Sequence, residues 1–171
     1  MNLPLDEPRD QPDEREGLVE FLDYQRQVLR RKVAGLSAEE LRRTVGASSL
    51  TLGGLLKHLS LVEYTWFLDR TAGEALPEPF AAIDWRSDRD WDFESAADDS
   101  PEELLDLHER AVESSREVLA GIADLGTPLR RRSHGSVQNV RWVLIHMIEE
   151  YARHLGHADL LRESIDGAVG D

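Results

Sequence analysis

Glu150 and His154 are the residues whose types and spacing most clearly indicate chemistry in this sequence. They lie four positions apart in a segment with helical periodicity, so both side chains leave the same face of a helix about one turn apart. A carboxylate oxygen and an imidazole nitrogen placed in this way can bind one cation. His146 and His157 extend the polar line, four positions before Glu150 and three after His154.

His58 is the natural third ligand for such a cation. It follows Leu55 by three positions and precedes Val62 by four, which places it on the inward, apolar stripe of an earlier helix. An imidazole that points inward needs a polar partner. Two histidines and one carboxylate from facing helices form a three-ligand site with open positions, which suits zinc, with nickel, iron or manganese as alternatives.

The same residues also allow an interpretation without a metal. Taken alone, an inward histidine is more often a hydrogen-bonded core residue, and a glutamate four positions before a histidine is a common surface pair. No HExxH motif, P-loop or dinucleotide fingerprint competes for the chemistry. His108 and His134 are expected on the surface or in a loop, and neither is assigned to the site.

The elements that must position these residues are helices. Apolar spacings of three and four predict four long helices, and a capping-box pattern predicts a short helical turn over 37–40. The connection 71–99 is long and contains Trp85, Trp91 and Phe93, so we expect it to pack back onto the helices, as a pocket wall or as a plain crossover. The predicted long helices run over 14–34, about 51–70, 100 to about 122, and from between 136 and 140 to about 166.

This pattern predicts an all-α fold, a four-helix bundle with a long crossover between the second and third helices. Residues 1–13 contain three prolines among charges and are expected to form an N-terminal arm. Residues 14–171 are expected to form one domain, because the chain of 171 residues suits a single core.

The net charge and the absence of cysteine exclude or disfavour several classes of function. The formal net charge of −14 disfavours binding to nucleic acids and to anionic membrane surfaces, and the cluster Arg130–Arg132 is too short to change this. The chain has no cysteine, which excludes disulfides, iron–sulfur clusters and a cysteine nucleophile. No apolar run approaches the roughly 18 residues that span a bilayer, and the acidic N-terminus is unlike a signal peptide, so a cytoplasmic location is expected.

Two blocks of the sequence, LGGLLKHLSLVE and WVLIHMIEEYARHLGHADLLRESIDG, carry a family resemblance. They resemble the DinB superfamily, also called the YfiT-like metalloenzymes, and within it the branch that includes the N-terminal domain of mycothiol-dependent maleylpyruvate isomerase. The resemblance runs from the first helix to Gly167 and implies a four-helix bundle with a long crossover. It also implies that His58, Glu150 and His154 hold a divalent metal, since glutamate replaces the first of the paired histidines in this branch.

The resemblance further implies a function. Characterised relatives use low-molecular-weight thiols, so we expect a metal-dependent thiol S-transferase of the mycothiol type, acting on a small-molecule thiol and an electrophile. His146 and His157 then become candidate pocket residues that carry protons. The chain stops after the fourth helix, so the additional isomerase domain is missing and maleylpyruvate isomerisation is not expected. The alternative is a non-catalytic bundle that binds a metal or a ligand, and in either case a homodimer is a candidate assembly.

Overall fold

Each long helix begins at a side chain that accepts a hydrogen bond from its first turn. In the computed structural model, which describes residues 5–132 and 135–169, Asp13 accepts from the N–H of Glu16 at 2.8 Å. Ser100 forms a reciprocal capping box with Glu103, and Asn139 caps the last helix. The helices are α1 (Glu14–Val33), α2 (Ala38–Leu41), α3 (Leu52–Glu63), α4 (Trp91–Glu94), α5 (Pro101–Ala120) and α6 (Val140–Asp166), with η1 (Tyr64–Ala72), η2 (Phe80–Ala82) and η3 (Ser95–Ala97) between them.

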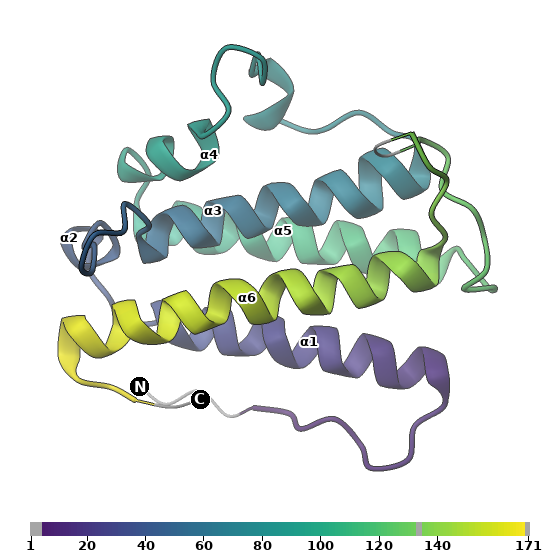
Figure 1. The fold of residues 1–171 in the computed structure, drawn as a ribbon, viewed down its shortest axis with the longest axis horizontal. Helices are drawn as coiled ribbons and strands as arrows, with labels where there is room; N and C mark the ends of the chain where they lie inside the picture. The colour runs from purple at the N-terminus through teal and green to yellow at the C-terminus, as the bar shows by residue number, and fades with distance from the viewer. Residues whose placement is uncertain (1–4, 133–134, 170–171) are drawn as a thin grey trace.

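The four long helices confirm the predicted all-α bundle (Figure 1). The described residues contain no strand, and Pro128 and Asn139 form an isolated bridge. The predicted boundaries agree closely with the structure, and Gly167 ends α6 with a φ of 76°, a left-handed conformation that glycine adopts readily. No described helix meets the length and apolarity that crossing a membrane requires.

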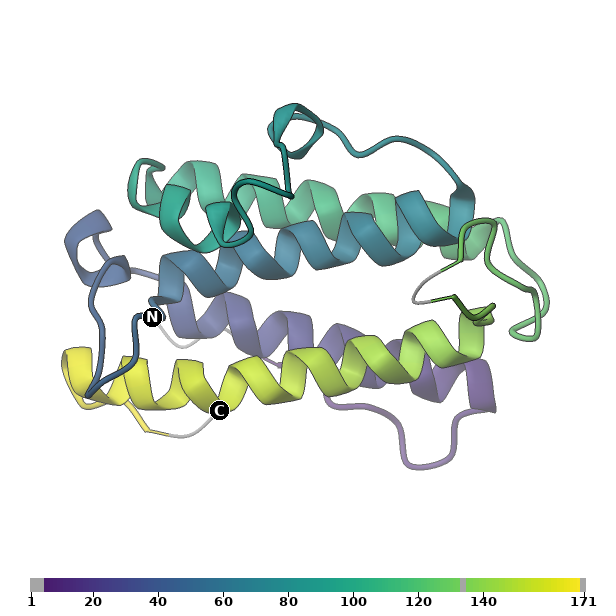
Figure 2. The ribbon, with the colours of Figure 1, turned by 45° about the horizontal axis from the view of Figure 1, so that its top comes forward.

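α1 runs parallel to α6 and α3 runs parallel to α5 (Figures 1 and 2), and the second of these pairings explains the long crossover. Glu14 at the start of α1 bonds Arg141 at the start of α6, and Lys32 near the end of α1 accepts from Arg162 near the end of α6. α3 and α5 also run side by side in one direction (Figures 1 and 2). A parallel neighbour requires the chain to return along a 20-residue helix, about 30 Å. Residues 73–100 make this return.

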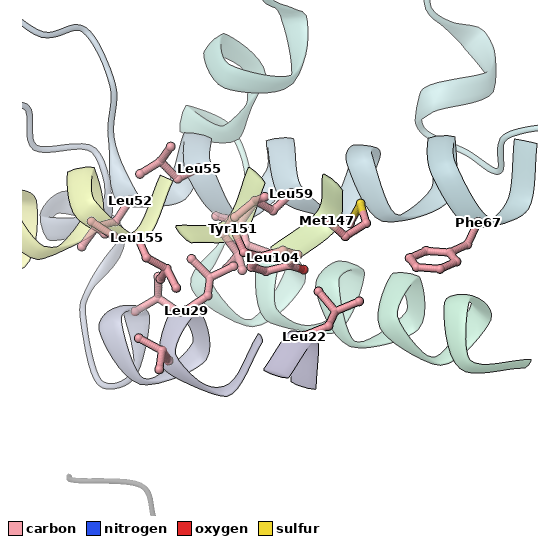
Figure 3. Close-up of a cluster of buried hydrophobic side chains, with 14 of the residues drawn as sticks. Leu22, Leu29, Leu52, Leu55, Leu59, Phe67, Leu104, Met147, Tyr151 and Leu155 are labelled. Atoms are coloured by element: carbon pink, nitrogen blue, oxygen red, sulfur yellow. The ribbon is translucent and has the colours of Figure 1, made fainter. Parts of the chain in front are cut away.

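The core lies between these four helices (Figure 3). α1 contributes Leu22 and Leu29, and aliphatic side chains from α3, α5 and α6 meet them. A smaller cluster of Tyr64, Phe80 and Leu107 receives Trp85 and Trp91. The aromatic residues of the crossover therefore pack back onto the bundle, as the sequence indicates.

The second predicted helix differs from the structure in its last turns. The sequence predicts one continuous α-helix from about residue 51 to about residue 70. In the structure α3 ends at Glu63 and continues as a π-helix, η1, that ends before Gly73. Thr71 donates its hydroxyl to the carbonyl of Trp66 at 2.7 Å, five residues back. Wider i→i+5 turns often mark functional sites, and this one positions Trp66 against α6.

The described part of the N-terminal arm, residues 5–13, lies along α1. The backbone N–H of Asp6 donates to Gln27, and Arg9 pairs with Glu16 and Glu20. The division into an arm over 1–13 and a domain over 14–171 stays a prediction.

Candidate metal centre

His58, Glu150 and His154 meet where α3 and α6 face each other. His58 Nε2 lies 3.5 Å from Glu150 Oε1, and His154 Nε2 lies 3.3 Å from the same oxygen. Each of the three residues offers one ligand atom, and all three atoms lie within 4.8 Å of one another. The structure therefore brings together the three side chains that helical spacing selects.

The spacing of these atoms fits a small cation. Zinc binds imidazole nitrogen and carboxylate oxygen at about 2.0–2.2 Å, so neighbouring ligands of a tetrahedral ion lie roughly 3.3–3.6 Å apart. The two separations at Glu150, 3.5 and 3.3 Å, fall in this range. The three side chains are only 14–19% exposed, so solvent reaches the site but the ligands are largely enclosed.

Asp92, in α4 of the crossover, orients His58. Its Oδ2 accepts from His58 Nδ1 at 2.7 Å, which leaves His58 Nε2 directed toward Glu150. Phe93 stacks on the His58 ring, with centroids 4.4 Å apart and planes 19° apart. A carboxylate behind a ligating histidine fixes its tautomer and its orientation. Sequence reasoning missed Asp92, although an acid between two aromatic residues in a segment that packs on the bundle was a usable signal.

The two ring nitrogens of His154 have different surroundings. Its Nε2 lies against Glu150, while its Nδ1 is buried and has no hydrogen-bond partner among the residues that the structure describes. Buried polar atoms are rarely left without a partner. Within this triad (His58, Glu150 and His154), the chain's own groups thus leave one imidazole nitrogen without a hydrogen bond.

Electrostatics couples the three residues. Burial lowers the pKa of His58, but hydrogen bonds to Asp92 and Glu150 outweigh burial and hold this pKa above its ordinary value. Hydrogen bonds from His154 and His58 hold the pKa of Glu150 well below its usual range, against the effect of burial. Glu150 is therefore a carboxylate at neutral pH, as a metal ligand must be.

The two other histidines of α6 have different surroundings. His146 lies between Trp66 and Trp142, and its Nδ1 is 3.4 Å from Glu149 Oε2. His146, Glu149 and Glu150 also offer ligand atoms within 4.8 Å of one another. His157 is exposed, and in the described part of the chain its side chain makes no hydrogen bond or ion pair.

The expectation for His108 is wrong. His108 is fully buried, and its Nε2 lies 2.9 Å from the hydroxyl of Tyr151. It shares a helical face with Leu104 and Ala111, both buried in the bundle, and this phase places it inside. His134 lies outside the described residues.

A second polar cluster lies in the core beneath the triad. Arg26 makes two hydrogen bonds to Glu63, both of 2.7 Å, and Tyr151 donates to Glu63 at 2.8 Å. Arg26 and Glu63 are both buried, so their charges are paired inside the bundle. With His108 behind Tyr151, this core network (Arg26, Glu63, Tyr151 and His108) ties together all four long helices. Sequence reasoning did not identify it.

Comparison with known proteins bears on this arrangement. Residues 17–167 match the model of the mycothiol-S-transferase family, a span that includes the triad, the crossover and the core network. A search of curated proteins finds no match to this chain. The match covers most of the chain and agrees with the resemblance of the two sequence blocks that contain His58 and Glu150. The chain therefore belongs to the mycothiol-S-transferase family, within the DinB superfamily.

Proposed function

We propose that the protein joins the sulfur of a low-molecular-weight thiol of the mycothiol type to an electrophilic small molecule, at a divalent cation held by His58, Glu150 and His154. One observation carries the proposal: two imidazoles from different helices converge on one carboxylate oxygen at 3.5 and 3.3 Å. The family match names the thiol class. Zinc is the proposed ion, because three protein ligands with an open position are typical of catalytic zinc sites.

The chemistry of the cation is the lowering of the pKa of a bound thiol, which favours the thiolate nucleophile at neutral pH. The S–H bond breaks, the sulfur forms a bond to the electrophilic carbon, and the leaving group departs with its bonding electron pair. His146 is the proposed acceptor of the thiol proton, because its ligand atom lies within 4.8 Å of the one offered by Glu150. Asp92 and Phe93 hold His58 in place throughout.

The burial of the triad supports this function. Its side chains are partly exposed, so small molecules reach the site, while Phe93 covers one side of His58 and limits access of water. A thiolate is more reactive where it is less hydrated. The homodimer, the cytoplasmic location and the lack of nucleic-acid binding stay predictions.

The test is a transfer assay with zinc-loaded protein, mycothiol and 1-chloro-2,4-dinitrobenzene. We expect a rate at least about tenfold above the uncatalysed reaction. Removal of the metal by a chelator, or Glu150→Gln, should abolish the excess rate, while Glu163→Gln, an exposed acid on the same helix, should retain it. No excess rate with several thiols and several electrophiles would remove the transferase and leave a non-catalytic metal-binding bundle.

A further inference from the structure

Three aromatic rings form a cluster beside the triad. Trp142 stacks on His146 with centroids 4.9 Å apart, and Trp66 meets His146 edge-on at 4.8 Å. The two tryptophan rings are themselves 5.2 Å apart. Each ring of this Trp66–Trp142–His146 cluster therefore contacts the other two.

The cluster is continuous with the triad. Trp142 precedes Glu150 by eight residues on α6, two helical turns or about 12 Å along the axis. His146 lies midway, and its ligand atom is within 4.8 Å of the one offered by Glu150. Trp66 follows His58 on the facing chain segment, which runs antiparallel to α6, so both tryptophans lie at the same end of the site. His146 is therefore the part of the cluster that lies beside the triad, and the two tryptophans extend the cluster away from it.

Core packing accounts for Trp66 but not for Trp142. Trp66 is partly buried and packs against the main core, whereas Trp142 is 42% exposed. An exposed indole ring held by two neighbouring rings is a rigid, apolar platform. Glu149, whose Oε2 lies 3.4 Å from His146 Nδ1, also pairs with Arg153, so this acid next to the cluster has a cationic partner.

We propose that the Trp66–Trp142–His146 cluster binds an uncharged ring of the substrate whose reacting atom lies at the triad. This proposal rests on the proposed function. Ring faces that present C–H groups or π electrons pack favourably on indole, whereas the negative face of an aromatic ring repels an anion. The ring belongs to the body of the thiol or to the electrophile, and both sources share this chemistry.

The experiment measures KM and kcat for wild type, Trp142→Ala and Trp142→Phe in two arms. The thiol arm compares 1-thio-β-D-glucose with 2-mercaptoethanol, and the electrophile arm compares 1-chloro-2,4-dinitrobenzene with iodoacetamide. We expect Trp142→Ala to raise KM roughly fivefold to tenfold for the ring-bearing reactant of one arm, with kcat and the ringless reactants little changed. Trp142→Phe should restore most of the affinity, and the arm that responds identifies the source of the ring.

Leu160→Ala is the matched control, because Leu160 is an exposed apolar residue of α6 beyond the triad. It should leave every KM unchanged. Equal changes in KM for ring-bearing and ringless reactants, or no change in Trp142→Ala, would overturn the proposal.

A binding measurement separates this proposal from the transferase itself. Calorimetric titration of metal-free protein with the same reactants is free of thiol alkylation, because the chain has no cysteine. Ring-dependent binding that weakens in Trp142→Ala, without turnover in any variant, would support the aromatic subsite and contradict the transferase. Turnover without any dependence on the ring would support the transferase and contradict the subsite.

Discussion

The triad and the core network share α3 and α6 but differ in how their charges are balanced. Glu150 and Tyr151 are neighbours on α6, yet Glu150 faces the partly exposed triad while Tyr151 faces the core. In the core network the carboxylate of Glu63 receives Arg26 and Tyr151, so its charge is balanced by the chain itself. In the triad the charge is not balanced in this way.

The imbalance is visible in the residues around His58. Asp92 and Glu150 are carboxylates, and the two imidazoles carry positive charge only when protonated. With neutral imidazoles the cluster has a charge of −2, which a divalent cation balances. The charges of one cluster are therefore balanced by the chain's own groups, whereas a bound cation is our proposal for the other.

The largest predicted effect breaks the core network. Glu63→Gln removes the fully buried partner of Arg26 and leaves only Asp23, which is partly exposed, so we expect a loss of about 3 kcal/mol in the free energy of unfolding. Urea denaturation measures this loss. Glu109→Gln, which removes the exposed partner of Arg30, should cost less than about 1 kcal/mol. Similar losses in the two variants would contradict the contrast between buried and exposed pairs.

The second prediction concerns pH. Burial lowers the pKa of His108 to about 4, with Arg26 and Arg30 acting in the same direction and Glu63 against it. The unfolded chain then binds a proton near pH 6.5 that the folded chain does not bind, so stability falls as pH falls through this range. We expect His108 to remove about 2 kcal/mol between pH 7.5 and pH 5.

Denaturation curves of wild type and His108→Gln at both pH values test this effect. The difference in stability between the two proteins should shift in favour of His108→Gln at pH 5. A pH-independent difference would mean that the pKa of His108 is the same in the folded and the unfolded chain, as for an exposed side chain.

The third prediction, with a smaller expected effect, concerns the hydrogen bond by which Asp92 orients His58. Asp92→Ala removes the acceptor of His58 Nδ1, so we expect zinc affinity to fall about tenfold. Competition with a chromophoric chelator measures the dissociation constant. Asp90→Ala, an exposed acid two positions earlier, is the control and should bind zinc as wild type does. Unchanged affinity in Asp92→Ala would show that Asp92 does not support a ligand.

The comparison also explains which features could be predicted from sequence. Glu150 and His154 were predictable because an α-helix fixes the direction of residues four apart, and the phase of His58 followed from Leu55 and Val62. Asp92 was not, because it lies in an irregular segment whose path depends on tertiary packing. The bundle itself followed from apolar periodicity and capping residues.

The core network escaped prediction for a different reason. Arg26, Glu63 and His108 are polar residues, and a periodicity argument assigns polar residues to the surface. Their burial is stable because they pair with one another, which offsets the loss of hydration. His108 could have been placed by its helical phase with Leu104 and Ala111. The π-helical turns of η1 have no comparable pattern in the sequence.

The most direct test of the triad is the metal content of protein purified without an affinity tag. Elemental analysis should find close to one divalent ion per chain in wild type and in His157→Ala, an exposed histidine one turn beyond the triad. His154→Ala should lose the ion while its circular dichroism spectrum stays helical. An equal metal content in His154→Ala and wild type, or no ion in wild type even after incubation with zinc, would contradict the proposed centre.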